Sequence, residues 1–107
     1  MTSLERTLTF ISGGSVDRIP FHPILMRFAA QHAGVMYRDF CLSPVHKCMA
    51  NIRCAADFGS DWVNTMSDPW AEAEAFGTVL SYPENELPKV QRHAIEDIAD
   101  TEKMKVL

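Results

Sequence analysis

Two short β-prone segments, separated by predicted helices, constrain the fold of this chain more than any other feature. The first is Ile19–Pro23, which contains two prolines, and the second is Trp62–Met66, which is bounded by polar residues. Strands that alternate with helices favour parallel pairing and hence an α/β fold. A parallel sheet is buried on both faces, so two such strands alone would leave faces and edges open. We therefore expect an α/β segment that does not complete a sheet by itself.

Helix signals surround these two segments. Thr2 and Glu5 form a capping box, and Ser43 followed by Pro44 is typical of a helix start. Apolar stripes follow each signal and are expected to pack inward; they consist of Leu4, Leu8 and Ile11 in the first helix and of Val45, Met49, Ile52 and Ala56 in the second. The other expected elements are helices at Leu25–Ala33 and Ala71–Phe76, a hairpin of strands Thr78–Tyr82 and Lys89–Ile95, and a charged helix at Glu96–Leu107.

Composition narrows the functional class. Ten Lys and Arg against fourteen Asp and Glu give a net charge of −4, whereas a general nucleic-acid binder carries a basic stripe. No apolar run approaches the roughly 20 residues that cross a bilayer, and the N-terminus lacks the apolar stretch of a signal peptide. Three cysteines without close pairs are typical of a reducing compartment. We expect a soluble cytoplasmic protein without nucleic-acid or membrane partners.

The His46-Lys47-Cys48 tripeptide resembles a metal site only superficially. Residues two apart on a helix point about 200° apart, so His46 and Cys48 cannot face one metal ion. Free cysteine behaves as a small hydrophobic residue, and both Cys48 and Cys54 are expected on the packing surface of the helix. We predict no metal site in this chain.

Three polar residues occupy positions where a ligand site would form. Arg27 follows the first β-prone segment, Asp68 follows the second, and His22 lies within the first. Ligands of parallel α/β folds gather at the carboxyl ends of strands. Arg27 would bind a carboxylate there and Asp68 a cationic or N–H group. The alternatives are a surface salt bridge for Arg27, a helix-capping role for Asp68 and a structural hydrogen bond for His22, and the residues alone do not separate these readings.

Five segments carry a family resemblance. They are Asp17–Phe21, Leu25–Arg27, Asp57–Trp62, Ser67–Pro69 and Glu72–Gly77. In this order and spacing, from about residue 4 to 105, they resemble the uroporphyrinogen decarboxylase family. The family contains uroporphyrinogen decarboxylases and zinc-dependent methyltransferases that move methyl groups from corrinoid proteins to thiols. Both are (β/α)₈ TIM barrels, which take about 250 residues, so the resemblance implies that residues 1–107 are the N-terminal segment, with a helical lead-in and a small β-hairpin excursion.

The resemblance also implies roles for single residues. Asp68 matches the aspartate that holds pyrrole N–H groups, and Arg27 matches an arginine that binds substrate carboxylates. Decarboxylases carry a second arginine four positions later, where this chain has Gln31. The leading expectation is a parent enzyme that decarboxylates acetate side chains of a tetrapyrrole without a cofactor, with this segment inactive alone.

Two alternatives stay open. The first is the methyltransferase, because Glu72–Gly77 is closer to that branch; its zinc ligands would lie outside this chain, and its partner would be a corrinoid protein. The second is a non-enzymatic fragment or interaction module. In either case apolar surface meant for the rest of the barrel would drive self-association of the segment.

Overall fold

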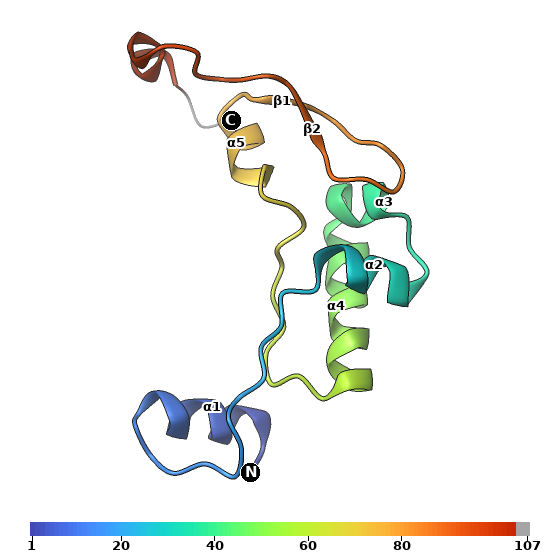
Figure 1. Ribbon diagram of the computed structural model, residues 1–107, viewed down its shortest axis with the longest axis vertical. Coiled ribbons are helices and arrows are strands. Elements are labelled where there is room, and N and C mark those ends of the chain that lie inside the picture. Colours follow the sequence, from blue (N-terminus) through green and yellow to red (C-terminus); the bar gives the residue numbers. More distant parts are fainter. Residues whose placement is uncertain (105–107) are drawn as a thin grey trace.

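A computed structural model of the chain describes residues 1–104 (Figure 1). Their radius of gyration is 17.5 Å and their extents are 51 × 34 × 17 Å, whereas a compact domain of this length has a radius of gyration of about 13 Å. The described residues therefore form an open, elongated arrangement. Its elements are α1 (Ser3–Ile11), α2 (Met26–Ala33), α3 (Tyr37–Leu42), α4 (Pro44–Phe58), α5 (Ala71–Ala75), β1 (Val79–Ser81), β2 (Lys89–Arg92) and the 3₁₀ helix η1 (Ile98–Lys103).

The core lies where helices α2, α3 and α4 pack together (Figure 1). Alanines on α2 and α4 let the helix backbones approach closely, and α3 fills the remaining space with two aromatic rings. Helix α3 was not predicted from the sequence, although it supplies the largest core side chains. The fully buried residues are Ala29, Ala30, Tyr37, Phe40, Ala50 and Cys54.

The predicted helix boundaries are confirmed by their caps. The Thr2 side chain accepts a hydrogen bond from the Glu5 backbone N–H, and the Glu5 carboxylate accepts one from the Thr2 backbone N–H, which completes the capping box of α1. At α4, the Ser43 hydroxyl accepts from the His46 backbone N–H at 3.3 Å. Helix α4 ends at Gly59, whose φ of 66° is the left-handed conformation that glycine adopts most readily.

The two expected parallel strands are extended but form no β-ladder. They lie side by side and lead in the same direction away from α1 (Figure 1), and one backbone bond joins them, from Asp61 N–H to Phe21 C=O at 2.8 Å. Pro20 and Pro23 have no N–H to donate, and the Asn64 side-chain amide, rather than a backbone group, reaches Pro23 C=O at 3.2 Å. The prediction of strands at 19–23 and 62–66 is therefore wrong at the level of hydrogen bonding.

The β-structure of the described residues is an antiparallel hairpin of β1 and β2, as predicted. Leu80 is opposite Val90 and Ser81 is opposite Lys89, with an irregularity between Val79 and Leu80. Helices together with this small sheet agree with the predicted mixed α/β class. The charged C-terminal helix was overpredicted: the chain forms only η1, and 105–107 lie outside the described residues. Ile98 of η1 is 86% exposed, so no apolar face packs there to extend the helix.

Both apolar stripes predicted to pack inward are exposed instead. On α4 the buried positions are Ala50, Asn51 and Cys54, one helix face away from the stripe. Helix α1 likewise buries Arg6 and Thr7 while its apolar residues face outward. The stripe residues are Leu4, Leu8, Ile11, Val45, Met49 and Ile52, each more than half exposed.

Candidate functional site

Asp68 is a buried carboxylate at the end of the second extended segment. Its residue is 3% exposed and its neighbour Ser67 is 2% exposed. One carboxylate oxygen accepts from the Ser67 hydroxyl at 2.8 Å, and the other accepts from the Trp70 backbone N–H at 2.8 Å. The second bond is a local turn contact and not the helix cap of the alternative reading, because the N-cap residue of α5 is Trp70 and no side-chain hydrogen bond caps that helix. Both donors are neutral, so the negative charge has no cationic partner among residues 1–104.

Helix α3 holds two titratable groups near this carboxylate. The Tyr37 hydroxyl donates to the Ser67 carbonyl at 2.5 Å, which fixes the backbone immediately before Asp68. Burial raises the pKa of Tyr37, and the nearby Cys41 and Asp68 raise it further. Burial, followed by the Asp68 charge, also raises the pKa of Cys41 to about 11. Both groups therefore stay protonated and neutral at pH 7.

Arg27 and Asp68 both act electrostatically on the Tyr37 phenol, and His22 packs against Trp62. The charge of Arg27 acts on the Tyr37 hydroxyl in the direction opposite to that of Asp68. Arg27 is exposed, and its guanidinium group forms no ion pair within residues 1–104. The exposed His22 ring instead packs against the Trp62 ring, with centroids 4.9 Å apart.

A cavity of about 330 Å³ opens beside Asp68. One wall is the second extended segment from Asn64 onward, and Ala71 and Glu72 of α5 form another. Lys47 closes the cavity from α4, half-buried near the start of that helix. The cavity thus combines a buried anion with a cation from a different element.

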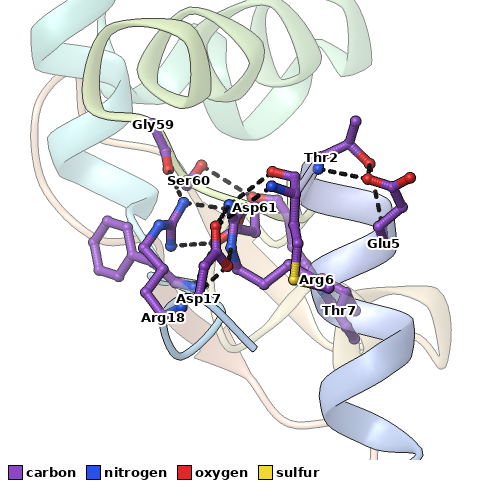
Figure 2. Close-up of polar contacts among 12 residues, drawn as sticks. Thr2, Glu5, Arg6, Thr7, Asp17, Arg18, Gly59, Ser60 and Asp61 are labelled. Carbon is purple, nitrogen blue, oxygen red and sulfur yellow. Dashed lines mark hydrogen bonds and ion pairs between the residues drawn. The ribbon is translucent and has the colours of Figure 1, made fainter. Parts of the chain in front are cut away.

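A second polar cluster joins α1 to both extended segments (Figure 2). Arg6 is 7% exposed, and its guanidinium binds both oxygens of Asp17 at 2.6 and 2.7 Å and Asp61 at 2.6 Å. Arg18 approaches the same Asp61 carboxylate at 2.5 and 3.0 Å. The Phe21 backbone N–H adds a bond to Asp61 at 2.8 Å.

These bonds fix the protonation states of the cluster. The Phe21 N–H bond, with the two arginines, holds the pKa of Asp61 well below its usual range. The Arg6 bond does the same for the pKa of Asp17, and Asp17 in turn raises the pKa of Arg6. Because every charge is matched by an opposite charge or a donor, the cluster is a structural junction. This cluster was not predicted from the sequence: Asp17, Arg18 and Asp61 lie within the motifs Asp17–Phe21 and Asp57–Trp62, but Arg6 lies outside both.

A larger cavity than the one at Asp68 lies next to this junction. It has a volume of about 570 Å³ and is lined mainly by the exposed stripe of α1 together with Trp62 and Val63. Its one carboxylate, Asp61, already has its oxygens bound, so the cavity offers apolar surface but little polar recognition. It is therefore a weaker candidate for a small-molecule site than the cavity at Asp68.

His46 and Cys48 are not brought together with further ligands. Within residues 1–104 the structure contains no group of three His, Cys, Asp or Glu residues placed to hold a metal ion. Cys54 is fully buried in the core, as expected, and Cys48 is half-buried. In the same residues, no helix combines the length and apolar character needed to span a membrane.

Comparison with known proteins decides the family. The family model described as "Uroporphyrinogen decarboxylase (URO-D)" matches residues 2–107, which is nearly the whole chain. This chain belongs to the uroporphyrinogen decarboxylase family. No curated protein and no solved structure matches it. The family assignment confirms the resemblance based on the five short segments.

In this uroporphyrinogen decarboxylase family chain, the sequence singled out Asp68 as a candidate but not the residues around it. Tyr37, Cys41 and Lys47 come from helices that are distant in sequence from Asp68, and no short motif connects them. Position relative to a strand end was enough to select Asp68. The contribution of Lys47 to the same cavity required the packing of α4 against the second extended segment.

Proposed function

We propose that this chain supplies the substrate-binding carboxylate of a uroporphyrinogen decarboxylase-like enzyme that acts on a tetrapyrrole. The observation that carries the proposal is Asp68, a buried carboxylate that lines a cavity and has only neutral donors. A buried charge without an ionic partner is costly, so the site favours a ligand that brings N–H groups or positive charge. The pyrrole N–H groups of a tetrapyrrole meet this requirement.

The chemistry that follows needs a fixed anion. When a pyrrole ring is protonated, positive charge spreads over the ring and its nitrogen. Loss of CO₂ from an acetate side chain then returns the electron pair of the broken C–C bond to the ring, and a proton replaces CO₂. A carboxylate already in place at the N–H group lowers the energy of the charged state by preorganised electrostatics. Asp68 would play this role, held in position by Ser67 and Trp70.

We assign substrate carboxylates to Arg27 and a flanking contact to His22. The planar guanidinium group of Arg27 matches the geometry of a carboxylate, and it is exposed and free of ion pairs in the described part of the chain. His22 is also exposed, and its ring is held by Trp62, so it would border the ligand from the first extended segment.

In this proposal residues 1–107 act as the N-terminal portion of a (β/α)₈ barrel, and the remaining catalytic groups come from outside them. We therefore expect no decarboxylation by this chain alone. No cofactor is assigned to it, and zinc would enter only if the parent were a methyltransferase. The three free thiols, Cys41, Cys48 and Cys54, support a reducing cytoplasmic location.

Binding of uroporphyrin, measured by quenching of its fluorescence, tests the proposal. We expect the wild-type chain to bind it and Asp68→Asn to weaken binding at least tenfold, because the amide removes the negative charge that faces the pyrrole N–H groups. Arg27→Gln should weaken it less, whereas Asp39→Asn, which changes a half-exposed carboxylate on α3, should have no effect. Equal affinities for wild type and Asp68→Asn would contradict the proposal.

The same variants address the alternative functions. Binding of a methylated corrinoid protein, without binding of uroporphyrin, would favour the corrinoid-dependent methyltransferase. Binding of neither would favour a non-enzymatic interaction module. Both outcomes would overturn the assignment of Asp68 to a pyrrole.

A further inference from the structure

The cavity at Asp68 contains a cation that the proposed function has not used. Lys47 lines the cavity together with Asp68, and it comes from the first turns of α4. No carboxylate within residues 1–104 lies within ion-pair distance of its ammonium group, although other lysines have such partners, as in Lys89 with Glu86 and Lys103 with Asp100. Lys47 is also half-buried, and its side chain borders the cavity.

Lys47 and Asp68 act on a shared neighbour. The charge of Lys47 lowers the pKa of Cys41 while the charge of Asp68 raises it. The two opposite charges are therefore both within electrostatic reach of one thiol, yet they do not pair with each other. A ligand between them would meet a negative group on one side and a positive group on the other.

The volume of the cavity limits what that ligand can be. About 330 Å³ is at the low end of small-molecule sites, which span roughly 300–1,000 Å³. This space suits one pyrrole ring with its side chains, so the other rings of a tetrapyrrole would lie outside it. Glu72 also lines the cavity, but it is exposed and its charge is screened by water.

We propose that Lys47 binds the side-chain carboxylate of a single pyrrole ring whose N–H group points at Asp68. This inference rests on the proposed function and assigns a substrate subsite within it. Lys47 would supply a second carboxylate contact besides Arg27, in a chain that has Gln31 where decarboxylases have another arginine. Lys47 is a specificity-determining residue in this account, because it acts on the side chain and not on the reacting ring.

A monopyrrole with acetate and propionate side chains, and its dimethyl ester, provide matched probes for an NMR titration. Wild type should bind the diacid about tenfold more tightly than the diester, which corresponds to one charge-assisted contact. Lys47→Met should bring the diacid down to the affinity of the diester and leave the diester unchanged. Lys47→Arg should retain the preference, and Lys103→Met, which removes an exposed lysine distant from the cavity, should match wild type.

The two probes distinguish the role of Lys47 from the proposed binding of a pyrrole at Asp68. An unchanged diacid-to-diester ratio in Lys47→Met would overturn the role of Lys47 alone. Asp68→Asn should weaken both probes, since both carry the pyrrole N–H. If Asp68→Asn binds both as well as wild type does, or if neither probe binds wild type, the assignment of a pyrrole to this cavity is wrong, and the role of Lys47 fails with it.

Discussion

The guanidinium of Arg6 lies 2.6 Å from the carboxylate of Asp61, and the two residues are 55 positions apart in the chain. Asp61 has a fully buried side chain and also accepts the backbone N–H of Phe21. One carboxylate therefore joins helix α1, the first extended segment and the second (Figure 2). The relative placement of the two segments, and hence of Arg27 and Asp68 at their ends, depends on this junction.

Removing the Asp61 carboxylate should destabilise the chain and make its stability depend less on pH. The pKa of Asp61 is lowered in the folded chain, so its contribution is complete above the unfolded pKa of about 4 and is lost as the pH falls below it. Urea unfolding at pH 7 and pH 3 measures the effect. Asp61→Asn should lower the urea midpoint at pH 7. It should also reduce the difference between the midpoints measured at pH 7 and pH 3. Asp39→Asn, at a half-exposed carboxylate, is the control and should preserve both. An acid response that Asp61→Asn leaves unchanged would contradict this role of Asp61.

Loss of the Phe40 ring should strongly destabilise the helical core. Phe40 is fully buried and packs on Tyr37 with ring centroids 5.8 Å apart. Phe40→Ala leaves a cavity that costs about 3–5 kcal/mol, a large fraction of the stability of so small a core. Circular dichroism during urea titration should show loss of helix at low denaturant. Phe10→Ala, at a half-exposed site on α1, is the matched control and should cost far less; equal losses would show that α3 does not anchor the core.

Cys41 should react slowly with alkylating agents. Its pKa is raised to about 11 by burial and by Asp68, whereas a free thiol has a pKa of about 8.5. At pH 8 the thiolate fraction, and with it the rate, should be lower by about a hundredfold or more. Mass spectrometry of the iodoacetamide-treated protein gives the rate for each cysteine, and the urea-unfolded chain gives the reference rate. Alkylation of Cys41 at the unfolded rate would contradict its placement beside Asp68.

We expect the chain to self-associate through its exposed apolar stripes. Leu4, Leu8 and Ile11 on α1 are 69%, 57% and 67% exposed, and together they line the larger cavity. Apolar patches of this kind seldom stay open to water. Sedimentation velocity should show a sedimentation coefficient that rises with concentration for wild type. The coefficient should be smaller for Leu8→Glu. A wild-type chain that stays monomeric at every concentration would refute this expectation.

Local signals explain how much of the fold was predictable. The capping box at Thr2 and Glu5, the Ser43-Pro44 start and the glycine after Phe58 are satisfied by neighbours in sequence, so α1 and α4 could be placed well. The direction in which the apolar faces of these two helices point could not be predicted. The sequence period identifies a stripe, but the buried face of α4 is set by Ala50 and Cys54, small residues that allow close contact with α2.

Long-range relationships account for what was missed at the site. Asp68 could be selected because it follows an extended segment, which is a local property. Lys47 and Tyr37 reach its surroundings only through the packing of α3 and α4, and Arg6 reaches Asp61 only when α1 folds back on the extended segments. The absence of a β-ladder depends on Pro23, which has no N–H, and on the Asn64 side-chain amide, which takes the place of a backbone donor at the Pro23 carbonyl. The strand preferences of single residues do not predict such a replacement.

The most direct test of the central claim is to map where uroporphyrin binds by its effect on the backbone amide signals of the ¹⁵N-labelled chain. We expect the amide signals of Asn64–Asp68, Trp70 and Lys47 to shift on titration, and Asp68→Asn to abolish these shifts. Shifts confined to α1, Trp62 and Val63 would place the ligand in the apolar cavity and contradict the assignment of Asp68 as the pyrrole-binding carboxylate.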